Sequence, residues 1–271
     1  FICFILCGAC KNSSASNSNS SSTNGVENKH DSLTIKLPDI PLLYTAPDQR
    51  AEYLANHYWD NFNFGDTSYV EKDVTEQAWV DYLNILHMLP LNISQESIKN
   101  TFRKAEADKR MLNDFMRMAD HYLYDPNSPM RNEELYIPML EAVIDSDSLL
   151  EMEKIRPKDR LEMAYKNRIG TKALDFTYTL ASGKQAKMHN LKTEYILLYF
   201  HNPGCHTCEE TSQRMKNSLQ LNHLLSQKKI TILTVYPDGE VDDWKAHLPE
   251  LSKDWINGYD KDMVLMYKKL Y

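Results

Sequence analysis

Two cysteines separated by two residues are the part of this sequence best suited to chemistry. Cys205 and Cys208 lie in FHNPGCHTCEET, residues 200–211, directly after the apolar run YILLYF. Such a pair on the first turn of a helix can close a small disulfide ring, and the helix N-terminus favours the thiolate of the first cysteine. We therefore expect Cys205 to attack a partner disulfide and Cys208 to release the resulting mixed disulfide.

Charged neighbours can adjust the acidity of this pair. A protonated His206 would favour a thiolate and make the disulfide more oxidising, although an exposed polar position is the alternative interpretation of this residue. Glu209 and Glu210 suit the dipole of a helix N-terminus but disfavour a nearby thiolate. We expect His206 and Glu210 to be tuning residues, and the direction of electron flow stays open.

Three other interpretations of the cysteine pair are less favoured. A structural zinc site needs about four ligands, and His189, His201 or His206 would have to complete it because the chain has no second cysteine pair. A one-cysteine peroxidase would carry Pro and Thr or Ser where Leu198 and Asn202 stand. A purely structural disulfide would close a ring too small to stabilise the chain much. We expect no metal and no cofactor.

The elements that precede the pair are predicted to be helical. From Pro38 to about Arg168, apolar residues recur at spacings of three and four. Helices are expected to begin at Pro47 and Asp73, to run unbroken from Ser94 to Asp125, and to cover 133–145 and 157–168. An aromatic cluster in this region fits a packed helical face better than a peptide-binding groove; its members are Tyr53, Tyr58, Trp59, Phe62 and Phe64.

After Gly170 the pattern becomes one of alternating strands and helices. LDFTYTL and KQAKM flank Ala181-Ser182-Gly183 and predict a β-hairpin. YILLYF is typical of a buried central strand, and KITILTVY predicts a second buried strand. Helices are expected from Cys205 to about Gln227, over EVDDWKAHLPEL and over DMVLMYKKL. This order argues for a parallel sheet with helices on its faces.

Composition narrows the classes of function. The chain contains 42% hydrophobic residues and can therefore form hydrophobic cores. Its net charge of -7, with Lys and Arg scattered among Asp and Glu, argues against nucleic acid as a partner. After the first residues, no apolar run is long enough to span a membrane.

The beginning of the chain carries a different signal. FICFILCGAC is an apolar run that ends in small residues before Cys10, which resembles the acceptor of a bacterial lipoprotein signal, although Cys7 stands where such signals usually have Leu. An uncleaved anchor and an ordinary secreted protein are the alternatives. Residues 11–37 begin with a Ser- and Asn-rich stretch that suits a flexible linker. We expect a protein lipid-anchored in the bacterial cell envelope, facing the periplasm or exposed on the surface.

From about Gly170 onwards, the chain resembles the thioredoxin-like thiol-disulfide oxidoreductases of bacterial envelopes, of the TlpA and ResA type. The resemblance rests on ALDFTYTLASGK, YILLYFHNPGCHTC and ITILTVYPDGEVDDWKAHL, in that order. IPLLYTAPDQRAEYLANHYWDNFNF resembles a helical domain of unknown function that often precedes such domains in envelope lipoproteins. The resemblance implies partners that are protein thiols or disulfides, with an unidentified electron donor or acceptor.

The sequence departs from this family's pattern in three respects. Gly204 replaces the usual aromatic residue before the first cysteine, and Thr211 replaces the usual acid after the second. The resemblance also implies a cis-proline loop and two further strands, and neither Pro237 nor Pro249 fits that loop. We therefore expect a chain cut at both ends, with an unpaired sheet edge, that exchanges disulfides poorly by itself.

The expected fold class is α + α/β, an all-helical domain followed by an incomplete thioredoxin-like domain. The expected division is a signal remnant at 1–10, a linker at 11–37, the helical domain at 38–168 and the thioredoxin-like domain at 169–271. The expected function is that of a membrane-tethered thiol-disulfide oxidoreductase. The alternative is a non-catalytic envelope lipoprotein whose helical domain binds a partner.

Overall fold

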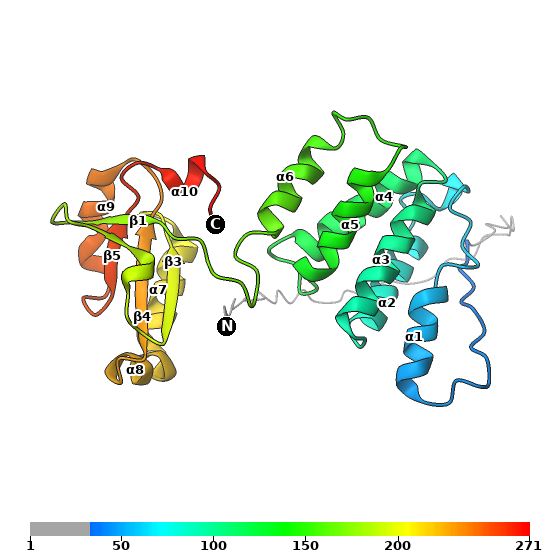
Figure 1. The fold of residues 1–271 in the computed structure, drawn as a ribbon, viewed down its shortest axis with the longest axis horizontal. Coiled ribbons are helices and arrows are strands. Elements are labelled where there is room, and N and C mark those ends of the chain that lie inside the picture. Colours follow the sequence, from blue (N-terminus) through cyan, green and yellow to red (C-terminus); the bar gives the residue numbers. More distant parts are fainter. Residues whose placement is uncertain (1–32) are drawn as a thin grey trace, which may run out of the picture. The chain divides into compact units, whose positions relative to one another are not determined.

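The computed structural model describes residues 33–271. The expected signal remnant, the lipid acceptor Cys10 and most of the expected linker therefore lie outside the described residues. The chain divides into two compact units between Leu161 and Glu162. The first is helical and the second combines a sheet with helices (Figure 1), so the predicted fold class, α + α/β, is confirmed.

Six α-helices form the described part of the helical unit, the last of them continuing to Ala164. They are α1 (Pro47–His57), α2 (Asp73–Leu86), α3 (Leu91–Ala105), α4 (Lys109–Ala119), α5 (Glu133–Asp145) and α6 (Ile155–Ala164). The predicted starts at Pro47 and Asp73 and the predicted helix over 133–145 are confirmed.

The prediction of a single long helix between Ser94 and Asp125 is wrong, because the helix is interrupted between α3 and α4. The side chain of Asp108 accepts hydrogen bonds from the backbone N–H groups of Arg110, at 2.8 Å, and Met111, at 3.3 Å. An aspartate in this position satisfies N–H groups that have no partner within a helix, and so starts a new helix. The apolar spacing continues across the break, which is why it did not reveal the turn.

Four of the five residues of the aromatic cluster are core, as their spacing predicted, whereas Tyr53 is only partly buried and its ring lies against Tyr44 and His57. Tyr58, Trp59, Phe62 and Phe64 are each at most 7% exposed. The ring of Trp59 lies 5.2 Å from that of Phe115 on α4, measured between centroids. These rings join α1 and its following loop to the remaining helices in one hydrophobic core.

The second unit contains a mixed five-stranded sheet. Its strands are β1 (Thr177–Leu180), β2 (Gln185–Lys187), β3 (Tyr195–Phe200), β4 (Ile230–Tyr236) and β5 (Ile256–Tyr259), in the order β2-β1-β5-β4-β3. The predicted hairpin is confirmed by the antiparallel pairing of β1 with β2. The sheet is only partly parallel, because β1 also pairs antiparallel with β5, while β3, β4 and β5 run parallel.

Two strands differ from the expectation. β5 was not predicted, because INGY is short and contains no alternating pattern. A Cβ at Gly258 would lie 2.8 Å from Cδ2 of Tyr178, so glycine allows β1 to approach β5 closely. β3 was expected to be central, but it lies at an edge of the described sheet and pairs only with β4.

Four α-helices accompany the described sheet: α7 (His206–Asn217), α8 (Leu219–Ser226), α9 (Val241–His247) and α10 (Val264–Tyr267). The helix expected to run to about Gln227 is divided at Ser218, whose Oγ accepts a hydrogen bond from the N–H of Leu221 at 3.3 Å. Phe176, Val235 and Leu265 belong to one core of this unit, whereas Trp244 and Tyr259 belong to another.

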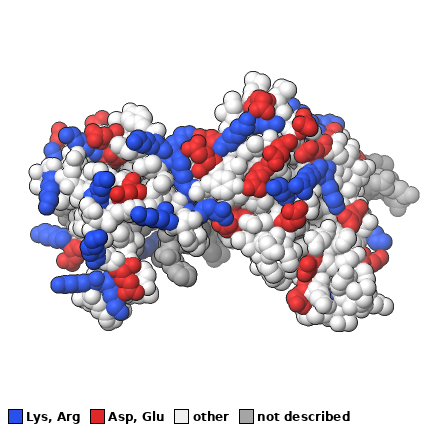
Figure 2. All heavy atoms as spheres, in the orientation of Figure 1, with Lys and Arg blue, Asp and Glu red and all other residues white. Residues whose placement is uncertain are grey.

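The described surface carries both signs of charge. Figure 2 shows Lys and Arg interspersed with Asp and Glu, with no extended patch of one sign on the face drawn. This agrees with the scattered charges of the sequence. Among residues 33–271, no helix combines the length and the apolar character that crossing a membrane requires.

Candidate functional site

The turn between β3 and α7 positions the cysteine pair. β3 ends at Phe200 and α7 begins at His206, so five residues change the chain from strand to helix. Gly204 has a φ of +70°, a left-handed conformation that costs glycine little but strains other residues. No heavy atom lies within 4 Å of the position that its Cβ would take. Backbone conformation, and not lack of space, therefore favours glycine at position 204 of this chain.

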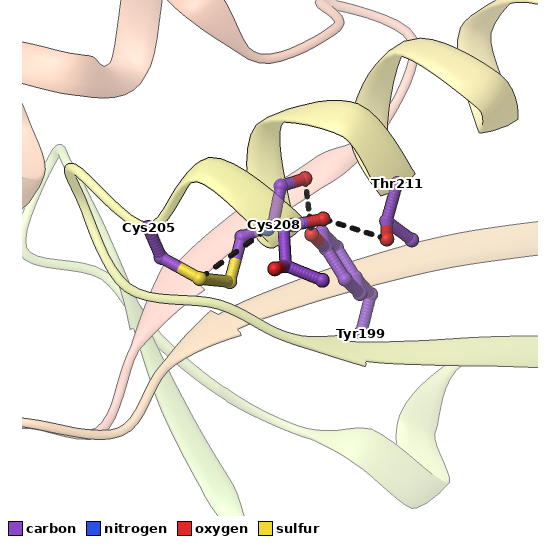
Figure 3. The surroundings of a disulfide bond; sticks show 5 residues. Tyr199, Cys205, Cys208 and Thr211 are labelled. Atoms are coloured by element: carbon purple, nitrogen blue, oxygen red, sulfur yellow. Dashed lines mark hydrogen bonds between the residues drawn. A yellow bond between two sulfur atoms is a disulfide. The ribbon is translucent and has the colours of Figure 1, made fainter. Parts of the chain in front are cut away.

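Cys205 and Cys208 are joined by a disulfide at the first turn of α7, with their Cα atoms 5.2 Å apart (Figure 3). Cys205 is the N-cap of this helix, and its Sγ accepts a hydrogen bond from the N–H of Cys208 at 3.3 Å. When the disulfide opens, this N–H and the positive end of the helix dipole favour the thiolate of Cys205. The structure thus brings the two predicted cysteines together in a geometry suited to the predicted roles.

Tyr199 connects β3 to the same turn of α7. Its hydroxyl donates a hydrogen bond to the carbonyl oxygen of Cys208 at 2.7 Å (Figure 3). Burial raises the pKa of Tyr199 to about 12, so the phenol stays protonated and remains a donor at neutral pH. Thr211, where the resembling family has an acid, donates to the carbonyl of Thr207 at 2.8 Å. At the position where the resembling family has an acid, this chain therefore has the hydroxyl of Thr211, which forms a hydrogen bond within the helix.

The two predicted tuning residues lie beside each other on the exposed side of α7. Nδ1 of His206 lies 3.7 Å from Oε1 of Glu210, and Glu210 also lies 3.7 Å from Nη2 of Arg214. The side chain of His206 is 83% exposed and that of Glu210 is 50% exposed. Solvent screens charges at such positions, so an effect of either residue on the cysteines stays a prediction.

A hollow of about 640 Å³ adjoins the disulfide. The end of β3, the first turns of α7 and the end of α9 enclose it, and Cys208 lies in its wall. His201 also lines this hollow and is only 7% exposed. Burial lowers the pKa of His201 to about 4, so its imidazole is neutral at neutral pH.

The sequence points to His201 only as a possible zinc ligand, and it gives no expected role for Tyr199. The rings of these two residues stack, with centroids 5.6 Å apart and planes inclined by 17°. Alternate residues of a strand point to the same face. The spacing Tyr199-x-His201, directly before the cysteine pair, is the signal that could have placed both residues on the face toward α7.

The described residues offer little support for a metal centre. Both cysteines are used in the disulfide, and within residues 33–271 no three His, Cys, Asp or Glu side chains lie where they could hold a metal ion together. Of the histidines considered as further ligands, His189 has its Nε2 2.9 Å from the carbonyl oxygen of Ala173.

Comparisons with known proteins agree with this architecture. The family described as "Domain of unknown function (DUF5106)" matches residues 7–167. Over 88% of its length, the chain is similar to 87% of a thioredoxin-like protein from Bacteroides caccae ATCC 43185, with 53% sequence identity and a TM-score of 0.84. The α/β unit therefore has a thioredoxin-like fold. A comparison with curated proteins finds no match.

Two further solved structures come from Bacteroides fragilis. One is the C-terminal domain of an uncharacterized protein from strain NCTC 9343, with 48% identity over 39% of this chain and 75% of that chain, and a TM-score of 0.38. The other is a conserved protein of unknown function, with 27% identity over 39% of this chain and 77% of that chain, and also a TM-score of 0.38.

Proposed function

Because this chain belongs to the DUF5106 family and is similar over most of its length to a thioredoxin-like protein, we propose that it is a thiol-disulfide oxidoreductase. Its substrates are disulfides or thiols of other proteins, and Cys205 and Cys208 carry the reaction. The fold alone supports redox chemistry only in a general way, since one fold hosts many functions. The assignment to the TlpA and ResA type rests on the sequence resemblance.

The observation that carries the proposal is the disulfide at the start of α7, with the N–H of Cys208 directed at Sγ of Cys205. In the reduced protein, the Cys205 thiolate attacks a substrate disulfide, one substrate sulfur leaves as a thiolate, and a mixed disulfide forms. The Cys208 thiolate then attacks Sγ of Cys205, so that the second substrate sulfur leaves. The substrate gains two electrons and the protein returns to the disulfide form.

Replacing Cys208 with Ala tests the proposal. Without the resolving thiol, the reduced protein is expected to accumulate a mixed disulfide through Cys205 in close to stoichiometric amounts when it meets a peptide disulfide. Intact-mass measurement under non-reducing conditions detects the adduct. The wild-type chain, under the same conditions, is expected to return to the free disulfide form.

The matched control is the double variant Cys205→Ser, Cys208→Ala. It retains the three cysteines near the N-terminus, Cys3, Cys7 and Cys10, and measures their background reaction. If the single variant captures no more peptide than this control, the protein is not a redox enzyme. The non-catalytic alternative, in which the helical unit binds a partner, would then be preferred.

We further propose that Cys10 is lipid-modified and tethers the protein in the bacterial cell envelope, facing the periplasm or the cell surface. Only the sequence supports this, through Gly8-Ala9 before Cys10 and the Ser- and Asn-rich stretch after it. In bacterial cells that express the chain behind a lipoprotein signal peptide, Cys10→Ala is expected to move the protein from the membrane fraction to the soluble fraction. An unchanged distribution on immunoblots of the two fractions would rule out this anchor.

A further inference from the structure

His201 is a buried polar side chain whose presence the two sulfur attacks of the exchange reaction do not explain. It is 7% exposed, and its Nε2 is buried without a hydrogen-bond partner among the described residues. Such atoms are rare in folded proteins because burying an unpaired polar group is costly. A polar atom kept in this state next to a reactive disulfide therefore needs an explanation.

The position of His201 connects it to Cys208 in two ways. Both residues line the hollow beside α7. The ring of His201 also stacks on Tyr199, whose hydroxyl donates to the carbonyl of Cys208 at 2.7 Å. The hollow and the stacked rings therefore connect the imidazole with the resolving cysteine.

The second half of the exchange reaction needs a proton acceptor at this place. Cys208 must lose its proton before it can attack Sγ of Cys205, because the thiolate is the nucleophile. A free thiol has a pKa of about 8.5, so only a small fraction is ionised at neutral pH. Cys208 is the N–H donor to Sγ of Cys205, and its own sulfur receives no such N–H from residues 33–271. Its ionisation therefore calls for another group.

We propose that His201 accepts the thiol proton of Cys208 as the mixed disulfide is released; this inference rests on the proposed function. The proton moves from Cys208 to the imidazole, and the Cys208 thiolate attacks Sγ of Cys205. The bond between Cys205 and the substrate breaks, and the substrate sulfur leaves with the electron pair. The proton returns to the departing thiolate or to solvent, so the step is balanced without a further reactant.

An imidazole with a pKa of about 4 is a weak base for a thiol, so the proton transfer depends on the two groups titrating together. With the disulfide closed, burial keeps the imidazole neutral at neutral pH, so that one ring nitrogen has a free lone pair. A thiolate formed in the same hollow would attract the imidazolium, raising the pKa of His201 and lowering that of Cys208 together. The other charged or titratable residues of the lining, besides Tyr199, are His206, Glu209, Glu210, Arg214, His247 and Glu250.

The test compares His201→Gln with the wild-type chain in rapid mixing against a fluorescent peptide disulfide. The attack phase of Cys205 is expected to be unchanged. The release phase is expected to slow by about 100-fold near pH 6.5, the order of magnitude of general base catalysis. Above about pH 9 the difference should vanish, because the Cys208 thiol then ionises without help. His247→Gln, which alters another histidine of the hollow, is the matched control and should leave both phases unchanged.

If His201→Gln lowers the release rate equally at every pH, the role of His201 is structural. If the variant leaves the release rate unchanged, His201 has no role in release. Either outcome overturns the inference. If the variant does not fold, the imidazole of His201 is titrated by NMR in the native chain. Its midpoint should rise by about one pH unit or more on reduction of the disulfide, and an unchanged midpoint overturns the inference. Failure of Cys208→Ala to capture peptide would instead refute the proposed function itself.

Discussion

Replacing Cys205 with Ser is expected to lower the rate of disulfide exchange by at least about a thousandfold, because the hydroxyl cannot take the part of the thiolate nucleophile. The attack step and the protein's own disulfide both require Sγ of Cys205. The measurement is the rate at which the reduced variant converts a fluorescent peptide disulfide to the thiol, compared with the wild-type chain under the same conditions.

Serine is the informative substitution because it keeps the local structure. Cys205 is the N-cap of α7, and its sulfur accepts from the N–H of Cys208. Serine is among the preferred N-cap residues, so its Oγ can accept the same hydrogen bond, whereas alanine would lose about 1 kcal/mol of helix stabilisation. A Cys205→Ser variant that retains its circular dichroism spectrum and also retains its exchange rate would exclude Cys205 as the nucleophile.

Replacing Trp79 with Ala is expected to destabilise the helical unit by about 3 to 5 kcal/mol, the usual cost of removing a fully buried aromatic side chain. Trp79 is 0% exposed. Its ring centroid lies 6.1 Å from that of Phe102 on α3 and 5.6 Å from that of Phe115 on α4. The substitution removes aromatic contacts between α2 and both of these helices. Urea unfolding followed by far-UV circular dichroism measures the loss.

Asn84→Ala provides the control on the same helix. Asn84 lies on the exposed side of α2, and substitutions at such positions usually change stability by less than about 0.5 kcal/mol. Trp79→Phe should fall between the two, because part of the aromatic contact is kept. A Trp79→Ala variant as stable as the control would mean that this aromatic core contributes far less than its burial implies.

Local signals predicted much of both units. The spacing of apolar residues located most helices of the first unit, and Gly183 between two alternating segments located the β1–β2 hairpin. Residues 205–208 were assigned to a strand-to-helix junction because an apolar run ends just before them. Each of these features depends on neighbours within a few positions, which a single sequence displays directly.

Other features depend on contacts between distant residues, and local patterns predicted them wrongly or not at all. β5 is a strand because β1 and β4 supply partners on both sides, not because INGY favours one. The break at Asp108 divides two helices that apolar spacing joined into one. β3 was expected at the centre of the sheet because it is apolar, but strand order is set by which partners pair with it.

The sequence alone determined that this chain carries two thiols at a strand-to-helix junction, because residue type and spacing are local properties. Only the tertiary structure decided what surrounds them. Tyr199 and His201 gain their significance because β3 lies under α7, which brings the hydroxyl of Tyr199 to the Cys208 carbonyl and buries the imidazole beside the same hollow. Burial and its effect on the pKa of His201 result from packing between elements distant in the sequence.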